Sequence, residues 1–259
     1  MLVLKKTKLG ETDLIITGFS EEGSQVRAVA KGARKSGSKL AVPLELYSVT
    51  RVLLHEGRGL GIIREVSIVE SNASCRSDVI HSAGAAVIVE LLEQISTEGN
   101  CEVRLFPMAR EALRCLGSLP EEAVFLITAA AVLKIAAQLG FRPSMQECVL
   151  CGESMGAPLI PGDSSSGLCF SIGEGGLICS NCHGSLVDQP YIMLKPQISS
   201  WIETLLSSRF AELARCSGTD FTQAQCRSLG ISLLTFANNW ICFHMVRRLK
   251  SLDFLLSFD

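Results

Sequence analysis

Four cysteines carry the strongest chemical signal in this chain of 259 residues. Cys148 and Cys151 form one C-x-x-C pair, and Cys179 and Cys182 form a second. Two such pairs are the usual sequence form of a tetrahedral zinc site with four thiolate ligands. Because four protein ligands leave no coordination position open for water, a site of this kind stabilises structure instead of activating a substrate. We therefore predict one structural Zn²⁺ ion.

Alternatives to this zinc site remain open at the level of sequence. A C-x-x-C pair can also be a redox-active dithiol, or two buried thiols without a metal. Cys169 and His183 lie in the same segment and could replace one of the four ligands. The gap of 27 residues between Cys151 and Cys179 is longer than the usual spacing, so we expect it to contain an ordered hairpin or loop.

A basic segment near the N-terminus is the second candidate site. Residues 26–44 contain no acidic residue at all. Its basic residues, with one more just beyond it, are Arg27, Lys31, Arg34, Lys35, Lys39 and Arg51. Gly32 and Gly37 would let the backbone approach a phosphate chain closely. The pattern favours a groove for a nucleic-acid backbone, and the alternative is a solvated loop.

Catalytic motifs are missing from the sequence. The four histidines are scattered, and no G-x-S-x-G, H-E-x-x-H or phosphate-loop pattern occurs. Phe19 and Tyr47 are the aromatic residues of the first 70 positions, and we expect both in the core or at the rim of the fold instead of stacked on bases. We therefore expect a binding protein that is not an enzyme.

The charge is distributed unevenly along the chain, although the formal net charge is only −2. Residues 1–65 contain eleven Lys/Arg and seven Asp/Glu, a balance of +4, whereas the remainder contains 13 and 19, a balance of −6. The basic part suggests a partner with phosphates, and the acidic part suggests a different partner.

Composition also indicates the cellular compartment of the protein. Eleven cysteines that are mostly isolated fit a reducing environment. The N-terminus lacks the apolar core of a signal peptide, and the apolar run Ala123–Leu133 is too short to cross a bilayer. We expect a soluble, cytoplasmic protein without a membrane partner.

Five strands are expected in the first 70 residues, where β-branched or alternating runs are separated by turn residues. These runs are residues 2–8, 13–20, 25–30, 45–54 and 60–69. No segment between them could form a crossover helix, so the pattern favours a small antiparallel barrel. A five-stranded OB-fold is our prediction, and an SH3-like barrel is the alternative that strand count does not exclude.

Helical periodicity replaces the strand pattern after residue 71. We predict helices over residues 79–95, 101–116, 120–140 and 196–208, and one long last helix over 221–252 that opens with a Thr222-x-x-Gln225 capping box. The fold class is thus α+β multidomain. We place an OB-fold DNA-binding domain at 1–72, the first part of a helical domain at 73–147, a zinc-binding module at 148–190 and the second helical part at 191–259.

Three sequence segments together resemble the RecO family of DNA recombination and repair mediators. They are Gly10-Glu-Thr-Asp-Leu-Ile15, then Ala30-Lys-Gly-Ala-Arg-Lys35 with Ser38-Lys39 and Leu44–Ser48, and finally Gly175-Gly176 followed by the second cysteine pair. The order of barrel, helices and four-cysteine unit is similar along essentially the whole chain. Pro43-Leu-Glu-Leu-Tyr47 departs from the family pattern, which tends to have Gln-Pro-Phe there.

The resemblance implies a function without catalysis. RecO proteins bind single- and double-stranded DNA, anneal complementary strands, and work with RecR to help RecA replace single-strand-binding protein, which implies a place at the nucleoid. It implies DNA contacts at Lys31, Arg34, Lys35 and Lys39, and zinc ligands at the four paired cysteines. Two rival interpretations are a helical zinc-containing scaffold that binds only proteins, and a zinc enzyme with an open coordination position.

Overall fold

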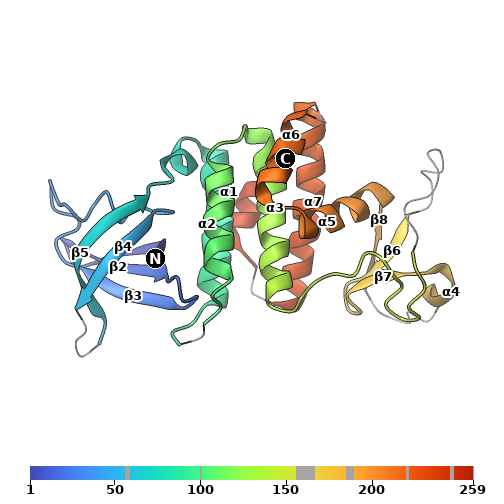
Figure 1. The fold of residues 1–259 in the computed structure, drawn as a ribbon, viewed down its shortest axis with the longest axis horizontal. Helices are drawn as coiled ribbons and strands as arrows, with labels where there is room; N and C mark the ends of the chain where they lie inside the picture. Colours follow the sequence, from blue (N-terminus) through green and yellow to red (C-terminus); the bar gives the residue numbers. More distant parts are fainter. Residues whose placement is uncertain are drawn as a thin grey trace. The chain divides into compact units, whose positions relative to one another are not determined.

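A computed structural model describes residues 1–55, 59–99, 101–155, 167–184, 190–219, 222–245 and 248–258. The chain divides into two compact units, which are described separately. The first contains Met1–Val124 and the C-terminal Leu249–Asp259, and the second contains Phe125–Arg248. Helices and strands follow in the order that Figure 1 shows.

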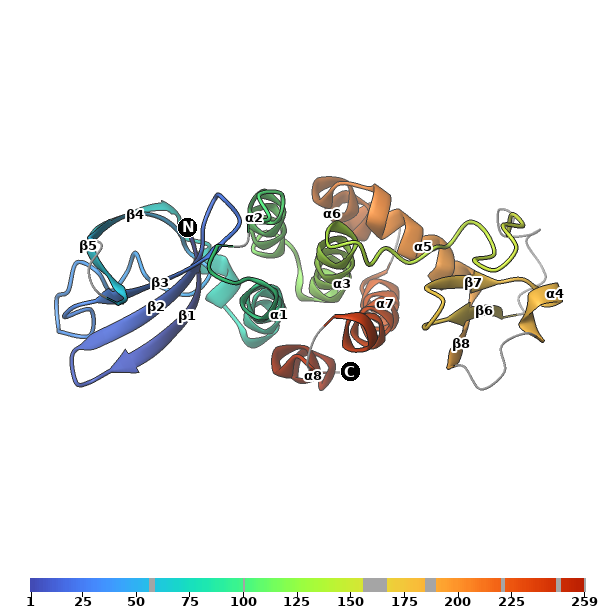
Figure 2. The same cartoon turned by 90° about the horizontal axis from the view of Figure 1, so that it is seen from below.

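Five strands of the first unit close into a barrel (Figure 2). They are β1 (Leu2–Leu9), β2 (Asp13–Phe19), β3 (Gln25–Ala30), β4 (Val49–His55) and β5 (Gly61–Glu70). The strand order is β1-β2-β3-β5-β4, with β3 parallel to β5 and β1 pairing with β4 at Leu2 and Val49. This order confirms the predicted OB-type barrel over the SH3-like alternative.

The barrel encloses an aliphatic core, as its low aromatic content requires. Its central cluster of buried residues consists of Val3, Leu14, Ile16, Ala28, Ala30, Ala33, Leu44 and Ile63. Two of them, Ala33 and Leu44, come from the connection between β3 and β4, so this connection closes one end of the barrel instead of looping away from it. The predicted strand 45–54 begins only at Val49, because Tyr47 has a positive φ of 70° that ends extended structure.

Helices complete the first unit. They are the short 3₁₀ turn η1 (Ala73–Arg76), α1 (Val79–Ile95), α2 (Leu105–Leu116) and the C-terminal α8 (Lys250–Leu256). Helix α1 has the predicted bounds, and the side chain of its N-cap residue Asp78 accepts a hydrogen bond from the backbone N–H of His81. The second helix begins later than expected, because the backbone N–H of Glu102 donates to Gly23 in the turn between β2 and β3.

The second unit combines helices with a small sheet. Its helices are α3 (Glu121–Gln138, whose first four residues fall in the first unit), α4 (Ser180–His183), α5 (Pro196–Ser207), α6 (Phe210–Thr219) and α7 (Gln223–His244). Its strands are β6 (Leu168–Ser171), β7 (Gly176–Ile178) and β8 (Tyr191–Leu194), in the order β7-β6-β8. Phe170 of β6 packs edge-on against Phe236 and Trp240 of α7, so the sheet is anchored on this helix.

The prediction of one long last helix over residues 221–252 is wrong. The Thr222–Gln225 capping box does begin α7, but this helix ends at His244, and α8 begins at Lys250. The reason is a tertiary contact within the first unit: the carboxylate of Glu90 on α1 accepts the backbone N–H groups of Lys250 and Ser251. A carboxylate at a helix N-terminus satisfies donors that have no partner within the helix, and thereby starts a new helix there.

No helix in the described part of the chain is long and apolar enough to cross a membrane.

Candidate metal centre and nucleic-acid interface

The two cysteine pairs converge on one point of the second unit. The sulfur atoms of Cys148, Cys151, Cys179 and Cys182 all lie within 4.8 Å of one another. The sulfurs of Cys151 and Cys179 are 3.7 Å apart. Four thiolates at a Zn–S distance of about 2.3 Å in a tetrahedron would be separated by about 3.8 Å. The four cysteines are therefore close enough together to hold a metal ion, and their spacing fits zinc.

Each cysteine pair lies in a tight backbone turn. In the first turn, Gly152 has a φ of +75° and donates its N–H to the carbonyl of Cys148, 2.8 Å away. In the second turn, the carbonyl of Cys179 accepts the N–H groups of Cys182 and His183. A hydrogen bond from Val149 to the carbonyl of Leu177 joins the first turn to β7, which leads into the second. The β6–β7 hairpin thus lies between the pairs, as the long gap predicted.

The four neighbouring thiols influence one another's ionisation. Burial opposes ionisation of the Cys148 thiol, but backbone N–H groups of Cys179, Cys151 and Leu150 donate to its sulfur and lower its pKa to about 6. The neighbouring sulfurs of Cys151 and Cys179 raise the pKa of Cys182 to about 12. Four thiolates this close repel one another, so full ionisation requires a compensating positive charge, which a bound metal ion provides.

The two substitute ligands do not join this group. Cys169 is buried in the same apolar cluster as Cys148, Ile178 and Cys179, and burial raises the pKa of its thiol. The ring of His183 instead lies edge-on against Tyr191, with the ring centres 5.3 Å apart. The group of candidate metal ligands found in the described residues therefore consists of the four paired cysteines.

The basic loop, by which we mean residues 31–39, is fastened to the turn between β1 and β2. The backbone N–H of Arg34 donates to the carbonyl of Thr12 at 2.9 Å, and its guanidinium donates to the carbonyl of Gly10 at 3.1 Å. These bonds join two segments that the sequence analysis singled out separately. In other OB-type barrels the β1–β2 loop often takes part in ligand binding, which makes the basic loop a candidate binding element.

Asp13 is the residue that fixes the loop's conformation. Its carboxylate accepts the backbone N–H of Gly32 at 2.7 Å, at a residue whose φ of +67° suits glycine. That bond, with one from the Thr12 hydroxyl and the nearby charges of Lys31 and Lys35, lowers the pKa of Asp13. The segment 26–44 contains no acidic residue, but in the folded chain Asp13 of β2 lies next to it.

The remaining loop cations stay open to solvent. Lys31, Lys35 and Lys39 form no ion pair within the residues that the structure describes. Arg27 lies on β3, where its cross-strand neighbour is Thr17, which in turn faces Lys5 of β1. Arg27 therefore lies on the outer face of β1–β2–β3, and the basic loop lies at the β1–β2 turn of the same strands. We call this face together with the basic loop the basic face.

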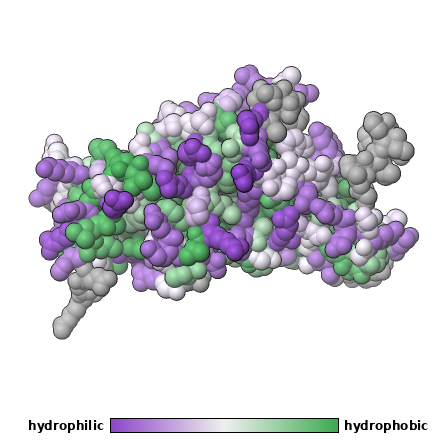
Figure 3. Space-filling view, in the orientation of Figure 1, coloured by the Kyte–Doolittle hydropathy of each residue, from purple (hydrophilic) through white to green (hydrophobic). Residues whose placement is uncertain are grey.

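Arg51 lies apart from the other candidate residues. It is on β4, opposite Ser67 of β5, and β4 does not pair with β2 or β3. Exposed apolar side chains, among them Leu53, Ile68 and Val69, lie on these same two strands. Figure 3 shows hydrophobic patches between hydrophilic ones on the surface of the barrel. Arg51 is therefore outside the basic face.

The barrel offers neither of its predicted aromatic residues for stacking. Phe19 is completely buried, and Tyr47 is buried with its hydroxyl donating to the carbonyl of Ser82. This confirms the expectation that both belong to the core or rim. Leu44 in the segment that departs from the family pattern also points into the core.

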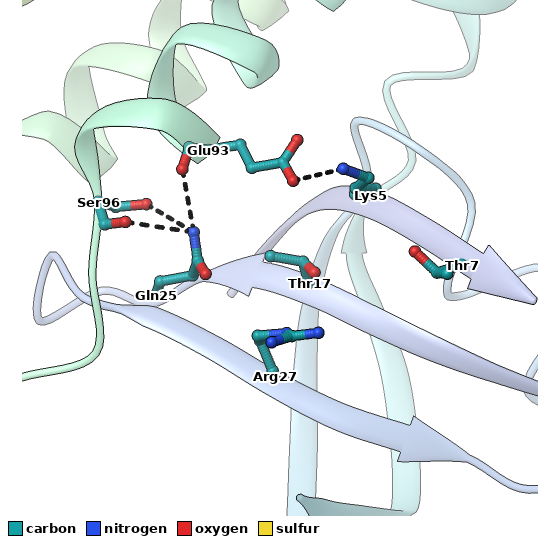
Figure 4. A pocket seen from close by; sticks show the side chains of 7 residues that line it. All are labelled: Lys5, Thr7, Thr17, Gln25, Arg27, Glu93 and Ser96. Atoms are coloured by element: carbon teal, nitrogen blue, oxygen red, sulfur yellow. Dashed lines mark hydrogen bonds and ion pairs between the residues drawn. The ribbon is translucent and has the colours of Figure 1, made fainter. Parts of the chain in front are cut away.

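Sequence reasoning missed a polar groove on the β1–β2–β3 face. It has a volume of about 310 Å³ and includes Lys5, Thr7, Thr17 and Arg27 from the strands (Figure 4). The alternation of β1 did not reveal it, because Lys6 and Lys8, which alternate with Lys5 and Thr7, are basic as well, and an irregularity between Val3 and Lys5 shifts the register of the strand.

These features define an OB-fold protein with a helical part and a four-cysteine module. Models of the N-terminal and C-terminal parts of recombination protein O match residues 1–72 and 76–190, respectively. The DNA repair protein RecO of Alkaliphilus metalliredigens (strain QYMF) is 33% identical over 182 residues, which are 70% of each chain. RecO of Desulfitobacterium hafniense (strain DSM 10664 / DCB-2) is 31% identical over 181 residues, 70% of this chain and 62% of that relative. RecO of Bacillus pumilus (strain SAFR-032) is 29% identical over 181 residues, 70% of this chain and 66% of that relative.

The chain belongs to the RecO family of recombination and DNA repair proteins.

Proposed function

We propose that this protein mediates DNA repair and homologous recombination by binding DNA on the basic face of its barrel and annealing complementary strands. The observation that carries the proposal is the basic loop, which the Asp13 and Thr12 contacts hold in place while Lys31, Lys35 and Lys39 face solvent. Membership in the RecO family supports the same role. Arg27 and Arg34 would add contacts on this face. Arg51 would contact the DNA only if the path of the DNA continued around the barrel.

The binding would be sequence-independent. Lysine and arginine that neutralise phosphates release counterions, and this gives affinity for single- and double-stranded DNA alike. Because Phe19 and Tyr47 are buried, neither would stack on bases, so the bases of a bound strand would stay available for pairing. No bond is made or broken in this mechanism.

We also propose that the four cysteines hold a structural Zn²⁺ ion. The 3.7 Å separation of two sulfurs and the all-thiolate donor set support zinc. The ion would offset part of the negative charge of the four thiolates and join the two turns, and it would have no part in DNA chemistry.

The protein partners of the proposed mediator are RecR, single-strand-binding protein and, indirectly, RecA. The acidic remainder of the chain suits proteins better than DNA. A groove of about 740 Å³ in the second unit, with Met193, Ile198, Leu229 and Ile231 in its walls, is where we propose that the short tail of single-strand-binding protein binds.

Annealing of two complementary, fluorescently labelled strands without ATP tests the function. We expect the protein to accelerate pairing, also in the presence of single-strand-binding protein, and we expect the acceleration to fall steeply with salt. DNA binding without acceleration in either condition would contradict the mediator role. Absence of DNA binding even at low salt would favour a scaffold that binds only proteins.

A further inference from the structure

The polar groove on the β1–β2–β3 face has an acidic residue in its wall. Lys5, Thr17 and Arg27 form one cross-strand row on its floor. Glu93 and Ser96, from the C-terminal end of α1, complete the groove. The Lys5 ammonium lies 2.7 Å from the Glu93 carboxylate, whereas Arg27 forms no ion pair within the described residues (Figure 4).

Glu93 is held in this position independently of its carboxylate. The side-chain amide of Gln25 on β3 donates to the backbone carbonyl of Glu93 at 3.1 Å, and to the carbonyl and hydroxyl oxygens of Ser96 at 3.3 and 3.2 Å. These bonds fasten the end of α1 to the barrel. The carboxylate of Glu93 is therefore not required for the attachment.

The site is also an unfavourable one for a carboxylate. Glu93 lies in the last turn of α1, where the partial negative charge of the helix end disfavours an anion, and no basic residue occupies that turn. The ammonium of Lys5 offsets this unfavourable interaction of the Glu93 carboxylate with the helix end. Both side chains remain partly exposed, at 53% for Lys5 and 28% for Glu93. An anion that approaches from solvent can therefore reach Lys5.

We propose that Glu93 is a built-in competitor of the nucleic-acid backbone: its carboxylate occupies Lys5 in the place that a DNA phosphate would otherwise take. The inference rests on the proposed DNA binding at this face. Glu93 would weaken the contact in the groove, while the basic loop at the β1–β2 turn, outside the groove, stays free. Exposed ion pairs are weak, so Glu93 tunes the affinity without blocking it.

Glu93→Gln in the full-length protein removes the charge and keeps the size of the side chain. We expect single-stranded DNA to bind about three- to tenfold more tightly at low salt, with a log–log salt slope steeper by about 0.7, because one more phosphate is neutralised. In a Lys5→Ala background the same substitution should change affinity by less than about twofold, because the ammonium of Lys5 is the group that Glu93→Gln releases for the phosphate.

Glu65→Gln on β5 is the matched control. It removes the same negative charge from the protein, but at an exposed position of the barrel outside the groove. Melting temperatures show whether Glu93→Gln still folds with α1 attached. An affinity of Glu93→Gln equal to the wild type or to Glu65→Gln, with wild-type DNA binding intact, overturns the competitor role alone. An equal increase in affinity in the Lys5→Ala background overturns it as well. If neither the wild type nor Glu93→Gln binds DNA, the proposed function and this inference both fail.

Discussion

The four-cysteine module and the basic face of the barrel place their reactive groups in opposite ways. The four sulfurs point at one another within 4.8 Å, and Cys148 and Cys179 are buried. The basic-loop lysines extend into solvent without ion pairs in the described part of the chain. A single small ion requires convergent donors, whereas a polymer of phosphates requires cations spread along a surface. The difference is the one expected between the proposed structural metal site and the proposed DNA-binding site.

The two regions also differ in what holds them together. The central cluster of the barrel has eight buried residues, all of them aliphatic. The cluster around the metal site has four buried residues, and three of them, Cys148, Cys169 and Cys179, are cysteines. A module with so little apolar content would depend on a bound metal ion for stability, which fits the proposed Zn²⁺. We expect mutations at the sulfurs to affect folding and mutations at the loop to affect affinity.

Cys148→Ser should have the largest effect. It removes one of four ligands, and metal binding at comparable sites contributes on the order of 10 kcal/mol to folding. We expect the bound metal, about one ion per chain in the wild type, to be lost and the melting temperature of the second unit to fall. Elemental analysis and calorimetry measure both. Cys101→Ser, at an exposed cysteine outside the site, should leave both unchanged. Wild-type protein that folds with no metal, after purification without chelator, would contradict the proposal.

Lys35→Ala combined with Lys39→Ala should affect DNA binding and leave the fold intact. Loss of two phosphate contacts should reduce the log–log salt slope by about 1.4 and weaken single-strand binding about 20-fold at 0.1 M salt, equally for all sequences. Fluorescence anisotropy across a salt series measures the slope. Arg114→Ala, on the exposed surface of α2, is the control. An unchanged slope in the double variant would place the DNA site elsewhere.

Asp13→Ala should loosen the basic loop. The lowered pKa of Asp13 means that folding favours its carboxylate form, so the bond to Gly32 contributes fully above the ordinary pKa of about 3.9 and is lost as pH falls through the lower, folded value. We therefore expect the Gly32 amide to stay protected at neutral pH in the wild type and to exchange faster in the variant. Trypsin should also cut the loop faster. Glu11→Ala, the neighbouring exposed acid, is the matched control, and equal behaviour of both variants would refute the role of Asp13.

Arg27→Ala and Arg51→Ala should give the smallest effects and the sharpest contrast. Arg27 lies on the basic face, so its loss should weaken binding about fivefold at 0.1 M salt, through one phosphate contact. Arg51 is on β4, outside that face, and its replacement should change affinity by less than about twofold. If Arg51→Ala had the larger effect, the DNA path would follow β4 and β5 instead.

Local sequence patterns predicted most elements because each pattern reports which side of an element is buried. The apolar spacing in residues 79–95 matched α1, and Gly140 ends the third helix with a φ of +95°. The same approach failed for the last helix, since the apolar spacing suggested one continuous helix, whereas α7 ends at His244 and α8 begins at Lys250. Only the carboxylate of Glu90, about 160 residues earlier, explains the new start at Lys250.

The two cysteine pairs, the basic loop and the five strands could be read from the order of amino acids alone, because spacing, charge and alternation are properties of neighbouring residues. Which of these groups meet depended on the folded chain. Folding brought the two pairs together through the β6–β7 hairpin, and it set Asp13 of β2 against Gly32. It also separated Arg51 from Arg27 and placed Glu93 of α1 beside Lys5. These pairings depend on strand order and helix docking, which are set by contacts between residues distant in the chain.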